Sequence, residues 1–471
     1  MFDFEITSDT VQRQAVDSKH AIVIGGSIAG LLAARVLADH FDQVTIIERD
    51  RFPEKPAPRA GVPQSYQLHV LLSQGQRIIE QLFPGLNDEL TVHGASTIDW
   101  TADYRLLLPR GWAPRFSSAI TSRSCSRNLL EAIIRQHLDS ESHVKFQLGT
   151  LVTGLLSNTL HTAVTGVRIK DGNDTEVELS AQLVIDASGR SSKAPLWLQS
   201  LGYDTPPQTV INSFLGYSSR TYQSLSGEPL DYKVLYIIPS APEHPRGGVL
   251  YQVEGNKWIV SLIGVGRDYP PTDEAGFLDF ARSLRSPEIY EAIKDGQPIS
   301  PIYGYQRTEN RLRHYEQLSR LPENFLVVGD AVCAFNPVYG QGITAAALGA
   351  LTLDHCLKQL KEHPSNRELT GLAIHFQKQL SKVNTAPWLI ATGDDFRWST
   401  TVGGQPSLMI RLMHWYLDQV MLTASSRAEV YEVFVKVLHL LQPPTALFQA
   451  EVLVPVLLQV INRRSKRMSE K

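Results

Sequence analysis

The stretch AIVIGGSIAG, residues 21–30, decides the fold of this chain. A run of apolar, largely β-branched residues enters a glycine-rich turn, and apolar residues then recur with helical spacing. A strand, turn and helix of this kind begin a nucleotide-binding βαβ unit, whose fingerprint is G-x-G-x-x-G. Gly25 and Gly30 hold the outer positions of the fingerprint, and Ser27 replaces the middle glycine. We interpret this serine as a working variant, because it is small and its hydroxyl can donate to a phosphate.

The residues that follow support a dinucleotide site. A second buried strand is expected at QVTIIE, residues 43–48, and Glu48 ends it about twenty residues after the glycine turn, where an acid binds ribose hydroxyls. The alternative is a βαβ turn that serves only packing, with Glu48 an ordinary surface acid.

Hydrophobic period and turn residues organise the rest of the chain. Prolines make residues 49–64 an extended loop, and amphipathic helices are expected at 73–85 and 126–138. Alternating residues predict one hairpin around Asp171-Gly172 and another around residues 254–256. Further buried strands are expected at 181–190 and 324–331, a long helix at 340–360, and mostly helices after residue 384.

The fold class is therefore α/β with an α+β insertion, because a β-rich segment interrupts the nucleotide-binding unit. The expected parts are a Rossmann-like nucleotide-binding domain built from discontinuous segments, a β-sheet substrate domain and a helical C-terminal region. Their expected limits are 1–110 and 111–200 (nucleotide-binding domain, the second with a hairpin), 201–310 (β-rich substrate domain), 311–383 (nucleotide-binding domain) and 384–471 (C-terminal helices).

A second motif, GDAVCAFNPVYGQG, spans residues 329–342 and also joins an apolar strand to a helix. Asp330 offers a carboxylate to sugar or ribitol hydroxyls. The loop from Pro337 onward brings backbone N–H groups and a helix N-terminus to one point, where they stabilise negative charge. A reduced flavin develops such charge on its ring, whereas a nicotinamide does not need this support. The alternative is another strand-to-helix turn without a ligand.

Composition excludes several classes of protein. Of 471 residues, 43% are hydrophobic and 20% charged, and the net charge of −3 offers no attraction to nucleic acid. Three scattered cysteines favour neither disulfides nor a metal site, so we expect a reducing, cytoplasmic setting. The acidic first ten residues do not resemble a secretory signal. EVLVPVLLQVI, residues 451–461, is too short to span a bilayer, and with the basic residues after it predicts at most peripheral membrane contact; the alternative is a helix packed on its own domain.

Four motifs, GGSIAG, SRNLLE, DASGRSS and GDAVCAFNPVYGQG, give the chain a specific resemblance. In order and spacing the chain resembles the FAD-dependent aromatic-ring hydroxylases and epoxidases of the para-hydroxybenzoate-hydroxylase-like fold. It is most similar to the monooxygenases of secondary metabolism. The resemblance implies FAD as the cofactor. The residues that it places at FAD are Gly25, Gly26, Ser27, Ile28, Ala29, Gly30, Glu48, Arg49, Gly61, Gln64, Arg127, Asp330, Pro337, Gly340, Gln341, Gly342 and Ile343.

The resemblance also implies the reaction. Reduced flavin and O2 form a C4a-hydroperoxide, which transfers one oxygen atom to a hydrophobic small molecule; no side chain is assigned a catalytic role. Electrons come from NADPH or NADH, or from a separate flavin reductase. Ser188 replaces an acid and Cys333 a histidine that many relatives carry, so direct use of NAD(P)H is less strongly implied than FAD.

Three alternatives share the FAD site: an isoprenoid (geranylgeranyl-type) reductase, a flavin halogenase and a non-catalytic FAD-binding protein. The chain lacks the W-x-W-x-I-P motif of halogenases.

The substrate cavity is expected between the flavin and the strands of residues 212–265. His69, Tyr217 and Arg220 are candidates to face it, each with a surface or packing role as the alternative, while Trp258 is expected in the core. The aromatic stretch of residues 394–420 either closes the cavity or caps the FAD-binding domain.

Overall fold

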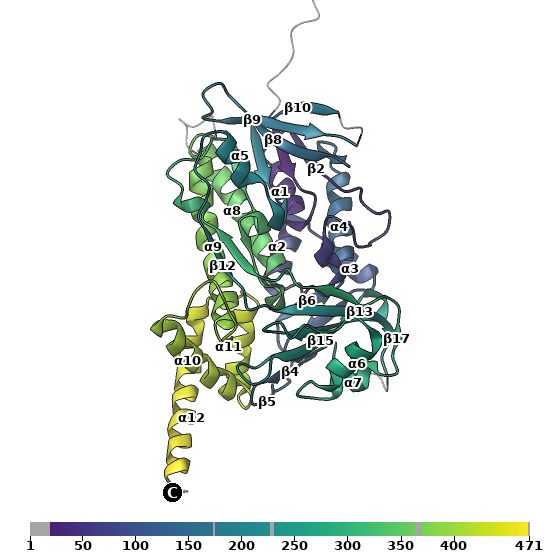
Figure 1. Cartoon of the computed structure of the whole chain (residues 1–471), viewed down its shortest axis with the longest axis vertical. Helices are drawn as coiled ribbons and strands as arrows, with labels where there is room; N and C mark the ends of the chain where they lie inside the picture. The colour runs from purple at the N-terminus through teal and green to yellow at the C-terminus, as the bar shows by residue number, and fades with distance from the viewer. Residues whose placement is uncertain (1–18, 173–174, 227–229, 363–368, 470–471) are drawn as a thin grey trace, which may run out of the picture.

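The computed structural model describes residues 19–172, 175–226, 230–362 and 369–469. The α/β part lies at one end of the molecule, and the large sheet and the C-terminal helices lie side by side at the other (Figure 1). The acidic N-terminal stretch and residues 173–174 of the first predicted hairpin lie outside the described residues. No helix among the described residues has the length and apolar character needed to cross a membrane.

A five-stranded parallel sheet forms the centre of the first part. Its strand order is β20-β11-β1-β2-β7, and every neighbouring pair is parallel. The inner strands are short and mostly buried, as expected of a parallel sheet covered on both faces, whereas β7 at the edge is partly exposed. Their bounds are His20–Ile24 (β1), Gln43–Glu48 (β2), Val144–Leu148 (β7), Leu183–Asp186 (β11) and Phe325–Val327 (β20).

Helices cover this sheet. The expected long helix is α8, which packs against α1, α2 and α9. The amphipathic helix predicted at 126–138 is α4, and the hydroxyl of Ser126 caps it by accepting a hydrogen bond from the Leu129 N–H. The bounds are Ile28–Ala38 (α1), Ser73–Leu82 (α2), Leu86–Val92 (α3), Arg127–Asp139 (α4), Ala194–Ser200 (α5), Gly342–Glu362 (α8) and Leu372–Asp395 (α9).

Smaller sheets surround this unit. The predicted hairpin at 166–180 is confirmed, since β9 and β10 are antiparallel and β8 completes a three-stranded sheet with them. The remaining small sheets are a β3-β6 pair and a three-stranded β12-β19-β21 sheet. The bounds are Ser96–Asp99 (β3), Thr121–Ser124 (β6), Leu151–Ser157 (β8), Val164–Lys170 (β9), Glu176–Ser180 (β10), Gln208–Ile211 (β12), Asn310–Arg313 (β19) and Cys333–Ala334 (β21).

The β-rich insertion is an eight-stranded sheet within the described residues, in the order β17-β13-β16-β15-β14-β4-β5 with β18 beside β13. It contains the predicted hairpin around residues 254–256. Alternate side chains point to its two faces: Leu235 and Ile237 pack under α6 and α7, whereas Val234 packs toward the C-terminal helices. The bounds are Tyr104–Leu108 (β4), Gly111–Trp112 (β5), Gly216–Ser224 (β13), Val234–Ile237 (β14), Arg246–Val253 (β15), Lys257–Gly264 (β16), Gln297–Pro298 (β17), Tyr303–Tyr305 (β18), Glu274–Arg282 (α6) and Glu288–Ile293 (α7).

Two elements cross the limits expected from the sequence. Strands β4 and β5 precede residue 113, in the segments assigned to FAD binding, yet β4 pairs in parallel with β14 of the large sheet. Helix α9 continues through residue 384, where the C-terminal region was expected to begin, with Pro387 inside it. In the first case the pairing partner lies more than a hundred residues away in sequence. Local patterns do not reveal such a partner.

Three C-terminal helices complete the chain: α10 (Leu408–Ala424), α11 (Ala428–Leu438) and α12 (Ala450–Ser469). They share a hydrophobic core with β4, β14 and β15 of the large sheet. The second half of α12 extends beyond the rest of the molecule (Figure 1).

Candidate active site

The first glycine turn is built by backbone contacts that leave no room for side chains. Gly25 has a φ of +104°, and a Cβ atom there would lie 2.7 Å from the carbonyl oxygen of Ala187. A Cβ on Gly30 would lie 1.8 Å from the carbonyl oxygen of Gly25, so α1 approaches the strand end more closely than alanine allows. The Gly26 N–H donates to the carboxylate of Glu48 over 2.8 Å. These glycines and this acid shape the end of β1 and β2.

Ser27, the departure from the fingerprint, joins two helices. Its hydroxyl accepts a hydrogen bond from Arg127 over 2.5 Å and donates one to Glu131 over 3.2 Å. Arg127 and Glu131 also form an ion pair of 3.0 Å one turn apart on α4. A glycine at position 27 would make neither side-chain bond. The serine therefore fixes Arg127, which lies in the α4 turn beside the predicted cofactor.

Arg59 is a site residue that the sequence analysis missed. Its guanidinium forms ion pairs with Glu48 (3.1 Å), Asp50 (3.0 Å) and Glu131 (3.0 Å), and its side chain is only 6% exposed. In the same proline-rich loop the Gly61 N–H donates a hydrogen bond to the Asp50 carboxylate, and the Arg49 guanidinium donates one to the Gly61 carbonyl. The available signal was an arginine among prolines in PAPRAGVPQ, but its three acidic partners come from other elements.

The second motif meets the first in space. Gly329 has a φ of +60°, and a Cβ there would lie 2.6 Å from the Cβ of Ala29 in the first motif. Asp330 follows it, 4.0 Å from Arg190. Burial raises the pKa of Asp330, while Arg190 and Arg127 act in the opposite direction. The two turns, some three hundred residues apart in sequence, thus form one site.

A single cavity of about 1580 Å³ runs past both motifs. Every residue predicted to contact FAD lines it except Gly26 and Gly30. These two glycines instead pack closely against protein atoms, as described above. A cavity for one drug-sized ligand measures about 300–1,000 Å³. This cavity therefore has room for a large cofactor and a second molecule.

The far part of the cavity is apolar. One wall is the large sheet, through residues such as Tyr236 and Ile263, and the opposite wall is formed by α10 and α11, through Met413, Leu417 and Leu438. The aromatic C-terminal stretch thus lines the cavity as well as packing on the sheet.

The candidates for facing the cavity differ in where they point. Tyr217 lines it and donates to Asn336 over 3.4 Å. Arg220 is absent from its lining and pairs instead with Glu274 at 2.6 Å. Trp258 packs in the core on the other face of the sheet, as expected.

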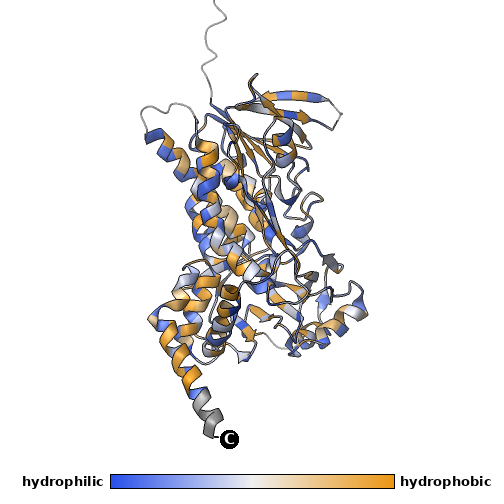
Figure 2. Ribbon diagram, turned by 60° about the vertical axis from the view of Figure 1, so that its left-hand side comes forward, coloured by the Kyte–Doolittle hydropathy of each residue, from blue (hydrophilic) through white to orange (hydrophobic). Residues whose placement is uncertain are grey.

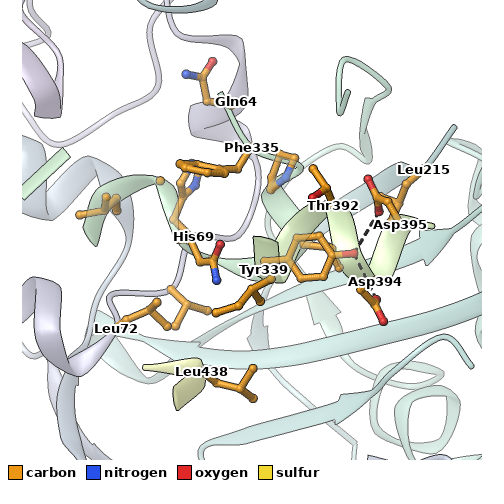
Figure 3. Close-up of a pocket in the computed structure, with 18 of the residues that line it drawn as sticks. Gln64, His69, Leu72, Leu215, Phe335, Tyr339, Thr392, Asp394, Asp395 and Leu438 are labelled. Atoms are coloured by element: carbon orange, nitrogen blue, oxygen red, sulfur yellow. Dashed lines mark hydrogen bonds between the residues drawn. The ribbon is translucent and has the colours of Figure 1, made fainter. Parts of the chain in front are cut away.

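His69 lines the cavity close to Phe335 (Figure 3). One ring nitrogen, Nδ1, lies 3.0 Å from the Gln67 carbonyl oxygen, so it carries the hydrogen and donates it. Burial, reinforced by the positive charge of Arg127, lowers the pKa of His69 to about 3. The imidazole is therefore neutral, and Nε2 remains a hydrogen-bond acceptor.

A polar cluster that the sequence analysis also missed lies where α9 ends beside the second motif. The Tyr339 hydroxyl lies 3.1 Å from Asp394 and 3.0 Å from Asp395 (Figure 3). Asn310 and Asn336 donate to the two oxygens of Asp395 over 2.6 and 3.2 Å. Asp395 is 1% exposed, and burial, together with the negative charge of Asp394, raises its pKa to about 7. This carboxyl holds both ends of the 337–339 turn that leads to Gly340.

The remaining polar candidates have structural roles. Asp186 is fully buried and accepts hydrogen bonds from the Ser188 N–H and the Ser192 hydroxyl. Cys333 is a buried free thiol whose pKa burial raises. Among the described residues, no group of three His, Cys, Asp or Glu side chains is placed to hold a metal ion.

The donors and the space in this cavity fit FAD. Glu48 and the first glycine turn, Arg127 and Asp330, and the N-terminus of α8 all line the cavity. A Cβ on Gly342, the first residue of α8, would meet no atom within 4 Å, so the backbone there borders open space. The helix N-terminus supplies N–H groups and partial positive charge to that space.

Comparison with known proteins agrees with this geometry. The family described as "FAD binding domain" matches residues 18–369. The chain belongs to this family. It is also similar to Protein Rv3254 of Mycobacterium tuberculosis, with 32% identity over 386 residues that cover 80% of each chain. Squalene epoxidase 4 of Arabidopsis thaliana is 24% identical over 419 residues, 84% of this chain and 74% of that protein.

A solved structure shows the same fold. The flavin-dependent brominase Bmp2 superposes with a TM-score of 0.66 at 13% identity, covering 95% of this chain and 100% of that one. The protein is thus an FAD-dependent oxidoreductase of the monooxygenase group, with the para-hydroxybenzoate-hydroxylase-like fold and a helical C-terminal region.

Proposed function

We propose that this protein inserts one oxygen atom of O2 into a hydrophobic small molecule of secondary metabolism, by hydroxylation or epoxidation. The observation that carries the proposal is the single cavity, which is lined both by the residues of the two glycine motifs and by apolar residues of the large sheet, α10 and α11. When bound, FAD supplies the redox chemistry and the activation of O2. The resemblance to squalene epoxidase 4 supports an apolar substrate.

In this proposal the first motif holds the nucleotide half of FAD. Glu48 binds the adenosine ribose, and the turn of Gly25 to Gly30, with Arg49, Gly61 and Arg127 beside it, holds the pyrophosphate side. Arg59 neutralises three buried acids around this turn and keeps it in place.

The second motif holds the flavin half. Asp330 accepts from the ribitol, and Pro337 with Gly340, Gln341, Gly342 and Ile343 faces the isoalloxazine, with Gln64 on the neighbouring loop. The helix N-terminus at Gly342 stabilises negative charge on the reduced ring. The buried oxygen Oε1 of Gln341 has no hydrogen-bond partner among the described residues, so it is available to a ligand N–H.

The substrate is proposed to lie against Tyr217 and the apolar walls. These walls exclude water from the reacting atoms, which protects a reactive oxygen species from wasteful loss. The neutral His69 offers an acceptor at Nε2 to orient a substrate hydroxyl or a water molecule. NADPH, NADH or a separate reductase is proposed as the source of electrons.

Labelled oxygen tests the proposal directly. Purified protein with FAD and a chemical reductant is incubated with terpenoid, polyene and aromatic compounds under ¹⁸O₂, and the products are analysed by mass spectrometry. A product that gains one labelled oxygen supports oxygenation, whereas a product that gains two hydrogens indicates the reductase alternative and overturns the proposal.

Neighbouring residues of α10 provide matched variants for this assay. Met413 lines the cavity, and Leu412 points outward with an exposed fraction of 56%. Met413→Trp is expected to lower product formation at least tenfold with FAD still bound, and Leu412→Trp to leave it unchanged. Equal effects of the two would contradict substrate binding at this wall.

A further inference from the structure

The outer face of the C-terminal helices carries an unusual number of exposed apolar side chains. On α10, Leu408, Met409, Leu412 and Trp415 are 50–75% exposed, and they recur with helical spacing. On α12, Val454, Leu457, Leu458 and Ile461 are 47–58% exposed along one stripe. The two helices pack against each other, and both are largely hydrophobic along these lengths (Figure 2). We call these eight residues the α10–α12 face.

Such a face requires a partner. Scattered single apolar residues are normal on a protein surface, but apolar stripes on adjacent helices mark a binding surface. The inner residues of α12, such as Val452 and Val456, are buried, so the helix already packs on the protein with its other side. The exposed stripe is therefore additional to the helix's internal packing.

The cavity reaches the surface beside this face. Three residues that line the cavity, Leu389, Met409 and Phe448, are also 56%, 69% and 42% exposed. Leu389 belongs to α9, Met409 to α10, and Phe448 to the turn before α12. These three residues form an apolar edge of the cavity that continues into the α10–α12 face, whereas its exposed lining elsewhere includes charged residues such as Arg110 and Glu243.

Exposed bases border the face, and acids lie beyond them. On α10 Arg411 is exposed, and the exposed Asp418 that follows the stripe is ion-paired with Arg397. On α12 Glu451 precedes the stripe and the exposed Arg463 follows it; the sequence then continues with Arg464, Lys466 and Arg467 before Glu470. Basic residues beside an apolar helix stripe favour an anionic lipid surface, where the stripe enters the headgroup region and the bases contact the headgroups.

We propose that the α10–α12 face docks on an anionic lipid bilayer and directs the cavity opening toward the lipid. The protein would lie on the membrane without crossing it, because no helix among the described residues is both long and apolar enough to span a bilayer. A water-insoluble substrate would then pass from the bilayer into the cavity along the apolar edge. The docking itself does not depend on the proposed reaction, because it involves no turnover.

Vesicle sedimentation tests the proposal. Full-length protein is mixed with phosphatidylcholine vesicles with or without 30% phosphatidylglycerol as the probe. Binding to the anionic vesicles is expected, weaker in high salt because the charge contribution is screened. Wild-type protein that stays in the supernatant with both kinds of vesicle would overturn the proposal.

Variants distinguish vesicle binding through this face from nonspecific adsorption. The double variant Leu412→Asp and Leu457→Asp is expected to weaken vesicle binding at least tenfold, with bound FAD and the melting temperature unchanged because both side chains are exposed. Val92→Asp, at an 85% exposed position on α3, is the matched control and is expected to bind as wild type does. Equal loss in the control would overturn the proposal.

A second copy of the chain is the other candidate occupant. Size-exclusion chromatography with light scattering measures this directly without lipid. A dimer that the double variant converts to monomer, with no vesicle binding by the wild type, would overturn the lipid proposal and identify the face as a subunit interface.

Discussion

A methyl group added at Gly342 provides the sharpest test of the proposed flavin site. The Cβ of Gly342→Ala meets no protein atom within 4 Å, and residue 342 lines the cavity at the start of α8. The fold has no reason to weaken, and alanine in a helix is favoured over glycine by up to about 1 kcal/mol. A methyl group forced into a filled site costs about 1–3 kcal/mol. If the isoalloxazine lies there, the Kd for FAD rises about 5- to 150-fold.

Two other glycines act as controls for this substitution. Gly349→Ala adds the same methyl group to the same helix, but its Cβ lies 3.3 Å from the flexible end of Leu380 and away from the cavity. Its affinity for FAD is expected to equal that of wild type. Gly30→Ala places a Cβ 1.8 Å from the Gly25 carbonyl oxygen and is expected to destabilise the apoprotein by about 3 kcal/mol.

The assay separates binding from stability. FAD affinity is measured by titrating apoprotein and following the flavin fluorescence, and stability by thermal unfolding with and without FAD, since a ligand that binds only the native state raises the melting temperature. Unchanged FAD affinity in Gly342→Ala would refute the position given to the isoalloxazine. If Gly349→Ala is stable but also fails to bind FAD, the lost affinity of Gly342→Ala cannot be assigned to filling of the cavity.

Three further predictions follow from single side chains. Asp330→Ala is expected to purify with little flavin, visible as lost absorbance near the flavin maximum, and full flavin content would contradict its proposed bond to the ribitol. Ser27→Gly is expected to keep FAD but to lose about 1–2 kcal/mol of stability in urea unfolding, because the bonds to Arg127 and Glu131 disappear; colourless protein would contradict this. The raised pKa of Asp395, about 7 against 3.8 unfolded, means that the native state holds this proton more tightly. As the pH rises from 4 to 7, this carboxyl therefore makes the unfolding free energy fall by up to about 1.4 kcal/mol per pH unit. Asp395→Asn is expected to remove this dependence on pH. Urea unfolding measures the unfolding free energy at pH 5 and pH 6.5, and an equal change between the two pH values in wild type and variant would disprove the assignment.

The sequence by itself determined the local structures and the type of cofactor. The order of apolar strand, glycine turn and helix at residues 20–38 is a short-range pattern, and Gly30 is needed for a contact with Gly25 within the turn itself. The same holds for the Ser126 cap of α4 and for the hairpin at residues 254–256. Such features follow from backbone sterics and side-chain period, which a single sequence displays.

Only the tertiary structure decided which side chains meet. It joined Ser27 to Arg127 and Glu131, brought Arg59 to three acids, and turned Tyr217 toward the cavity while Arg220 pairs elsewhere. The role of Asp395, the parallel pairing of β4 with β14 and the exposed apolar side of α10 likewise emerged only from the folded structure. The period of a helix or strand tells which residues share a face, but the partner of that face comes from segments hundreds of residues away. Burial, ion pairing and pKa shifts depend on that partner, so they exist only in the folded molecule.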